Sequence, residues 1–157
     1  MKKLALLLLM LLPICLPVLG VDDEFFLKER DDQTVIKAFE KAKQHIDLFL
    51  NALEERSTEN SRYEHYGVYL KFIEGEVVEY LWLGDVQKNE NFYIGVIISE
   101  PRLLKETKNG KTIGFHASDI YDWQVTEKKT GKSLGAFLIC ATSDTEYLNS
   151  SSFACNL

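Results

Sequence analysis

Two tryptophans and two aspartates are the side chains in this sequence whose types best suit ligand binding. Trp82 and Asp85 stand in one segment, and Asp122 and Trp123 are adjacent in another. If the two segments are neighbours in a sheet, these side chains could bind a sugar or a peptide through ring stacking and hydrogen bonds. Two carboxylates that flank a cleft are also the minimum set of a glycosidase. Asp85 and Asp122, with Glu79 as a further acid, therefore define a hydrolase as the alternative hypothesis.

A purely structural interpretation of the same four residues is simpler. Tryptophan is an ordinary core residue, and an aspartate at a strand end often accepts backbone N–H groups. The sequence leaves the binding interpretation and the structural interpretation both open.

The other signatures of catalysis are missing from the sequence. The three histidines, His45, His65 and His116, show no spacing typical of metal ligands. The chain has no Gly-x-Ser-x-Gly elbow and no glycine-rich phosphate loop. We therefore expect no metal and no cofactor, and the sequence favours a protein that is not an enzyme.

The first twenty residues have the layout of a secretory signal. Lys2 and Lys3 precede an apolar run over residues 4–16. Residues with small or medium-sized side chains, as a cleavage site requires, then lead up to Gly20, and an acidic stretch follows. The alternative is an uncleaved membrane anchor, but Pro13 and Pro17 interrupt the helix that would have to span. We expect cleavage after Gly20, which leaves residues 21–157 as a single periplasmic or secreted domain without stable membrane insertion.

The charge balance narrows the range of partners. The chain carries 18 Lys and Arg against 24 Asp and Glu, a net charge of −6, and has no basic run. Nucleic-acid binding needs clustered Lys and Arg, so the composition excludes nucleic acid as a partner. An unknown protein, peptide or glycan remains.

Two cysteines follow the signal segment, Cys140 and Cys155. Export to an oxidising compartment would allow a disulfide between them. A bridge closing a loop of about 15 residues stabilises a protein by about 3 kcal/mol in the chain-entropy model. The alternative is a buried Cys140 on a strand and a free Cys155 in a frayed tail, and both alternatives stay open.

The clearest secondary-structure pattern is a helix that begins after Asp31 or Asp32. Apolar residues recur there at steps of three and four, which places them on one helix face. They are Val35, Ile36, Phe39, Ala42, Ile46, Phe49, Leu50 and Leu53. The period ends over residues 54–57, so the pattern predicts one long N-terminal helix.

After residue 64 the apolar period changes to two. Alternation predicts strands near residues 66–72, 78–83 and 92–98, joined by short turns as in an antiparallel meander. Shorter strands are predicted at 112–115, 123–126 and 134–140, and the Ser- and Thr-rich tail over 142–152 reads as surface or disordered. The predicted fold is α+β: one long helix packed on a largely antiparallel sheet of about six strands, as a two-layer sandwich or a partly open barrel.

One stretch of the chain resembles a known family. The segment from Glu79 to Val86 reads EYLWLGDV, and an Ile-x-Asp-Trp element ends at Trp123. With the glycines and proline between and after them, these residues resemble domain of unknown function 2314, the YegJ-like bacterial family, over about residues 33–140. Tyr80 stands where that family often has His, and Ala136-Phe137 replaces a more polar segment. The resemblance implies an N-terminal helix, a β-rich body and a bacterial, periplasmic protein, without an assigned activity.

Export, an acidic composition, many aromatic residues and the missing catalytic motifs together favour one class of function. We expect a binding or interaction module for a peptide, glycan or protein partner in the cell envelope. Trp82, Asp85, Asp122 and Trp123 are its predicted binding residues.

Overall fold

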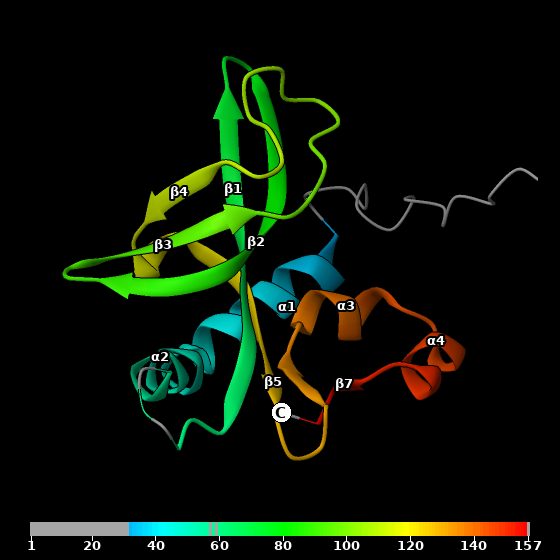
Figure 1. Cartoon of the computed structure of the whole chain (residues 1–157). Helices are drawn as coiled ribbons and strands as arrows, with labels where there is room; N and C mark the ends of the chain where they lie inside the picture. The colour runs from blue at the N-terminus through cyan, green and yellow to red at the C-terminus, as the bar shows by residue number, and fades with distance from the viewer. Residues whose placement is uncertain (1–31, 57, 59, 157) are drawn as a thin grey trace, which may run out of the picture.

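The computed structural model describes residues 32–56, 58 and 60–156 of the chain (Figure 1). The predicted signal segment, residues 1–20, lies outside these described residues. The elements are α1 (Gln33–Gln44), α2 (Ile46–Glu55), β1 (Tyr63–Glu74), β2 (Val77–Asn89), β3 (Phe92–Ile97), β4 (Thr112–Phe115), the 3₁₀ turn η2 (Ala117–Asp119), β5 (Ile120–Glu127), β6 (Ser133–Gly135), α3 (Phe137–Thr142), α4 (Thr145–Ser150) and β7 (Phe153–Ala154).

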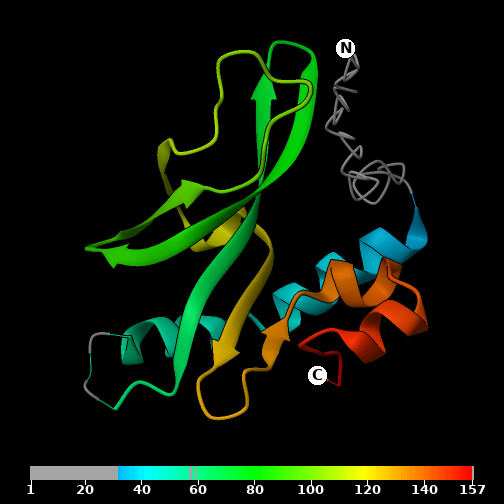
Figure 2. The same cartoon turned by 45° about the vertical axis from the view of Figure 1, so that its right-hand side comes forward.

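The strands form one seven-stranded sheet in the order β4-β3-β2-β1-β5-β6-β7. All neighbours are antiparallel except β6 and β7, which are parallel. Figures 1 and 2 show that the long β1–β2 hairpin extends away from the helices, which lie around the lower half of the sheet. The α+β class and the β1–β2–β3 meander are confirmed. The prediction of about six strands missed β7, because that strand is only two residues long and directly follows the Ser- and Thr-rich tail.

The prediction of one long N-terminal helix was wrong. Asp32, one of the two residues predicted as the cap, caps α1 and accepts a hydrogen bond from Thr34 N at 2.7 Å. The helix is interrupted at His45, where φ is −106° and ψ is 12°. Beside that break the indole Nε1 of Trp123 donates to the Ala42 carbonyl at 2.9 Å. A side chain that enters the carbonyl ladder bends a helix. The apolar period continues across His45, so no local pattern indicates the break.

The predicted strand over residues 134–140 was correct only at its start. Strand β6 ends at Gly135, and Ala136 turns the chain in the left-handed region with φ at +48°. Helix α3 then begins at Phe137. A short apolar run does not distinguish a strand from a buried helical turn, so the pattern alone could not settle this segment.

Gly135 allows the chain to make this turn without a steric clash. Its φ is +83°, and a Cβ built there would lie 2.2 Å from the backbone oxygen of Trp123. Ala136 N donates to that same oxygen at 2.7 Å. The β6–α3 turn can approach β5 this closely only because residue 135 has no side chain.

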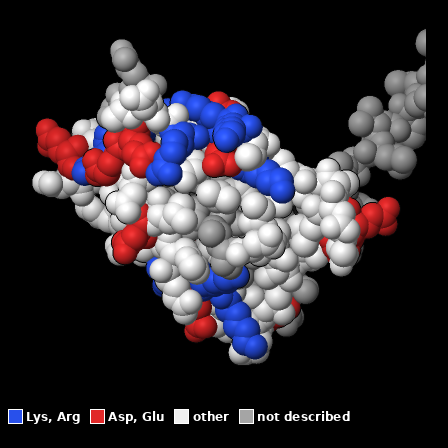
Figure 3. Space-filling model, turned by 90° about the horizontal axis from the view of Figure 1, so that it is seen from below, with Lys and Arg blue, Asp and Glu red and all other residues white. Residues whose placement is uncertain are grey.

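Charged side chains of both signs share the underside of the molecule. In the view from below, Lys and Arg lie among Asp and Glu and many uncharged residues (Figure 3). Arg62 and Glu55 form one exposed ion pair, with Nη2 and Oε1 2.8 Å apart. Among the described residues, no helix is long and apolar enough to cross a membrane.

Replacing Gly135 with alanine tests the β6–α3 turn. We expect Gly135→Ala to lower the free energy of unfolding by about 3 kcal/mol or more, because a left-handed backbone strain is combined with overpacking against Trp123. Gly131→Ala is the matched control, since Gly131 has φ at +68° and no atom within 4 Å of an added Cβ. That variant should lose only about 1 kcal/mol in urea unfolding. Equal losses in the two variants would contradict the steric role of Gly135.

Candidate functional site

Trp82 and Asp122 lie in register on the two sides of Tyr69. Tyr69 of β1 pairs with Trp82 of β2 and with Asp122 of β5. The exposed fraction is 7% for Trp82, 4% for Tyr69 and 0% for Asp122. The rings of Tyr69 and Trp82 are in contact, with centroids 5.1 Å apart, and burial raises the pKa of Tyr69. The structure thus brings two of the predicted residues to one buried row of the sheet rather than to an open surface.

Asp85 occupies a different environment. It is exposed, has φ at +51°, and sits where the β2–β3 register shifts between Gly84 and Gln87. Strand β1 separates β2 from β5, which puts the two strands about 10 Å apart at two inter-strand spacings. The hydrolase hypothesis needs Asp85 and Asp122 to flank one substrate, and this arrangement gives it no support.

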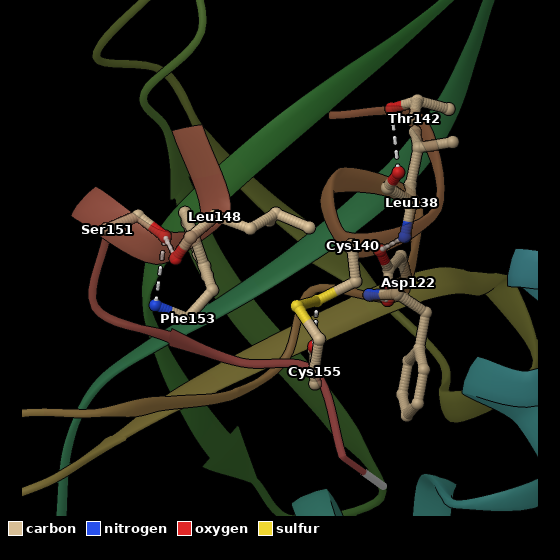
Figure 4. The surroundings of a disulfide bond; sticks show 10 residues. Asp122, Leu138, Cys140, Thr142, Leu148, Ser151, Phe153 and Cys155 are labelled. Atoms are coloured by element: carbon tan, nitrogen blue, oxygen red, sulfur yellow. Dashed lines mark hydrogen bonds between the residues drawn. A yellow bond between two sulfur atoms is a disulfide. The ribbon is translucent and has the colours of Figure 1, made fainter. Parts of the chain in front are cut away.

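The carboxylate of Asp122 holds the beginning of α3. Its Oδ1 accepts hydrogen bonds from Trp123 N at 2.8 Å and Phe137 N at 3.2 Å. Its Oδ2 accepts a third bond from Leu138 N at 2.9 Å (Figure 4). The N–H groups of Phe137 and Leu138 lie in the first turn of α3 and have no partner inside the helix, so the carboxylate satisfies them. Burial nevertheless raises the pKa of Asp122 from 3.8 to about 7, against the opposing effect of the three bonds.

The neighbouring residue, Trp123, holds α1. Its side chain is fully buried and packs against Phe49 of α2 and Phe137 of α3, with ring centroids 5.7 and 5.5 Å away. Its indole donates to Ala42 of α1. Two consecutive residues of β5 therefore fix the position of α1 and the position of α3.

A groove of about 380 Å³ lies between these two helices and β7. Lys37, Ala38 and Lys41 of α1 line one side. Phe137, Cys140 and Ala141 of α3 line another, and Ala154 and Cys155 complete the wall formed by β7. None of the described residues that line it is acidic. The groove thus combines an apolar floor with two cations, and Lys41 Nζ lies 5.5 Å from the centre of the Phe137 ring.

A disulfide joins two walls of this groove. Cys140 of α3 is bonded to Cys155, which follows β7, with the two Cα atoms 5.5 Å apart (Figure 4). Cys140 and Cys155 are both half-buried. The bond ties the C-terminal segment to the helix that Asp122 anchors, and so holds the β7 side of the groove against α3.

The sequence pattern did not reveal this groove. Lys37 and Lys41 lie between the apolar positions of the helical pattern, on the polar face where charged side chains are normally solvated. Their spacing of four residues, which places both on one helix face, was the available signal. Phe137 was assigned to a strand, so its place opposite α1 could not be foreseen. Only the pair Cys140 and Cys155 pointed to this part of the molecule.

The histidines take separate places in the fold. His45 stacks on Phe137, with ring centroids 5.7 Å apart. His65 is exposed on β1, and His116 precedes η2, where its backbone N–H donates to Asp119. Within the described part of the chain, no group of three or more His, Cys, Asp or Glu side chains could hold a metal ion.

The raised pKa of Asp122 predicts how stability changes with pH. Because the folded state holds the proton more tightly than the unfolded state, native stability should fall as pH rises from about 4 to about 7. Asp122→Asn removes this titration. The stability advantage of the native protein over Asp122→Asn should therefore shrink by about 1 kcal/mol per pH unit between pH 5 and 7, measured by urea unfolding. An advantage that grows with pH would mean that the ionised carboxylate is the favoured form.

Comparison with known proteins places the chain among bacterial relatives. A family described as "Uncharacterized protein conserved in bacteria (DUF2314)" matches residues 32–146. The uncharacterized protein YegJ of Escherichia coli strain K12 is 25% identical over 126 residues, covering 80% of this chain and 79% of YegJ. A putative ankyrin repeat protein of Neisseria meningitidis serogroup B is 27% identical over 107 residues, covering 65% of this chain and 42% of that protein.

No solved structure matches the chain. The family match extends from the N-cap of α1 into α4, and it includes β5 with Asp122 and Trp123. Because this match covers most of the sequence, the chain belongs to the bacterial DUF2314 family.

Proposed function

We propose that this chain is an exported binding domain that recognises a peptide segment of a partner protein through the groove between α1 and α3. The groove carries the proposal. It places two lysines beside an apolar floor, so it suits a segment in which acidic and apolar residues are neighbours. The four residues that the sequence singled out enter this account differently: Asp122 and Trp123 build the groove, whereas Trp82 and Asp85 lie outside it.

The charge distribution supports an acidic ligand at this site. The whole chain is negative, with a net charge of −6. No described residue that lines the groove is acidic, so Lys37 and Lys41 are the charged side chains in direct contact with a bound segment, and at physiological salt charges more than about 8 Å apart are largely screened. Lys37 is exposed and Lys41 is half-buried over an aromatic ring. A carboxylate bound between them would be paired locally while its apolar neighbour contacts Phe137.

The disulfide supports the proposal of export. Disulfides persist in oxidising compartments such as the bacterial periplasm and are rare in the cytosol. The bond between Cys140 and Cys155 therefore agrees with the signal-like sequence over residues 1–20. Recovery of the protein from the envelope fraction of expressing cells, with these thiols resistant to alkylation, is the check on this part of the proposal.

A short peptide tests the groove directly. The probe is acetyl-Asp-Glu-Phe-Leu-amide, titrated calorimetrically at physiological salt. We expect Lys37→Glu and Lys41→Glu each to weaken binding by about fivefold, because each replaces an attraction worth about 0.5 kcal/mol with a repulsion of similar size. Lys129→Glu is the control, since Lys129 is exposed in the β5–β6 turn outside the groove.

Two further peptides separate the contributions of charge and apolar contact. Acetyl-Lys-Lys-Phe-Leu-amide and acetyl-Asp-Glu-Ser-Ser-amide should both bind more weakly than the probe. Failure of the native protein to bind the probe, or equal loss of affinity in the Lys129→Glu control, would contradict the proposed site.

A further inference from the structure

We propose that the Cys140–Cys155 disulfide is a redox switch that controls the groove. In the oxidised form β7 completes the groove and the ligand binds. In the reduced form β7 leaves, one wall is lost and the affinity falls. This inference rests on the proposed function, because it concerns the regulation of the same site.

The position of the disulfide couples its chemistry to the groove. Both cysteines line the groove, Cys140 from α3 and Cys155 from the chain that follows β7. Neither cysteine is fully buried, so a reductant can approach from the groove itself. The two cysteines are therefore part of the surface that a ligand would contact, and their bond joins two of its walls.

The C-terminal segment has few other attachments. None of residues 139–156 is buried. Strand β7 pairs with β6 at only two positions, and Ser133 N donates to Ser152 O at 2.9 Å beside them. Helix α4 is capped by its own Asp144 and contributes no buried residue. A segment with so little buried surface opens readily once its covalent tether is removed.

Helix α3 differs from β7 in this respect. Its first turn is anchored by Asp122 through Phe137 N and Leu138 N, and Phe137 and Leu138 are buried. These contacts do not involve sulfur. Reduction should therefore release β7 while α3 stays in place, which makes the change a local opening and not a loss of the fold.

The chemistry is ordinary thiol–disulfide exchange with a dithiol. One thiolate of the dithiol attacks a sulfur of the Cys140–Cys155 bond and forms a mixed disulfide, releasing the other cysteine as a thiolate that takes up a proton. The second thiol of the dithiol then displaces the bound cysteine. The protein gains two electrons and two protons, and the dithiol becomes a cyclic disulfide.

Hydrogen exchange and peptide binding test the switch together. The protein is recovered from cells that express the full chain and is measured before and after treatment with dithiothreitol. On reduction, the amide of Ser133 should exchange on the order of tenfold faster or more, while those of Phe137 and Leu138 remain protected. The reduced protein should bind acetyl-Asp-Glu-Phe-Leu-amide about tenfold more weakly, as expected when one wall of the site is lost.

The double variant Cys140→Ser, Cys155→Ser is the matched control. It should behave like the reduced protein and should not respond to dithiothreitol. Unchanged exchange at Ser133 after reduction, or loss of protection at Phe137 and Leu138 as well, would overturn the local opening. Equal affinity of the oxidised and reduced forms would overturn the regulation alone, whereas an oxidised protein that binds no probe would overturn the proposed function and the switch with it.

Discussion

The buried carboxylate of Asp122 is the contact on which the rest of the structure depends. It lies on a central part of the sheet, is inaccessible to solvent, and accepts three backbone N–H groups, two of them from the first turn of α3. A buried carboxylate without such partners would cost several kcal/mol, so α3 has one position in which Asp122 is satisfied. Gly135 allows that position, because its turn reaches the backbone of β5 without a clash.

The residue beside it extends this constraint to the other side of the molecule. Trp123 fills the core between the helices, and its indole N–H is satisfied by the Ala42 carbonyl at the break between α1 and α2. One dipeptide of β5 thus sets the separation of α1 and α3, and the groove is the space left between them. The Cys140–Cys155 bond closes that space from the C-terminal side. The groove is therefore built from the core outward.

Local patterns predicted much of the fold, and they failed where a distant contact decided the outcome. Spacing and capping alone predicted an aspartate cap of α1 at residue 31 or 32, the strand at 112–115 and the meander of β1, β2 and β3. The break at His45 depends on Trp123, which is remote in sequence, so no local pattern contains it. The Ala136 turn depends on β5 in the same way. Asp122 and Trp123 were singled out from the sequence as ligand-binding residues, but both are buried, and their polar atoms bond to the backbone of α3 and α1.

The most direct test of this account is amide hydrogen exchange in the Asp122→Asn variant, compared with the native protein under conditions where both are folded. If Asp122 anchors α3, the amides of Phe137 and Leu138 should lose protection in the variant, while the helical amides of α1 keep theirs. Unchanged protection at Phe137 and Leu138 would contradict it, because α3 would then hold its place through packing alone.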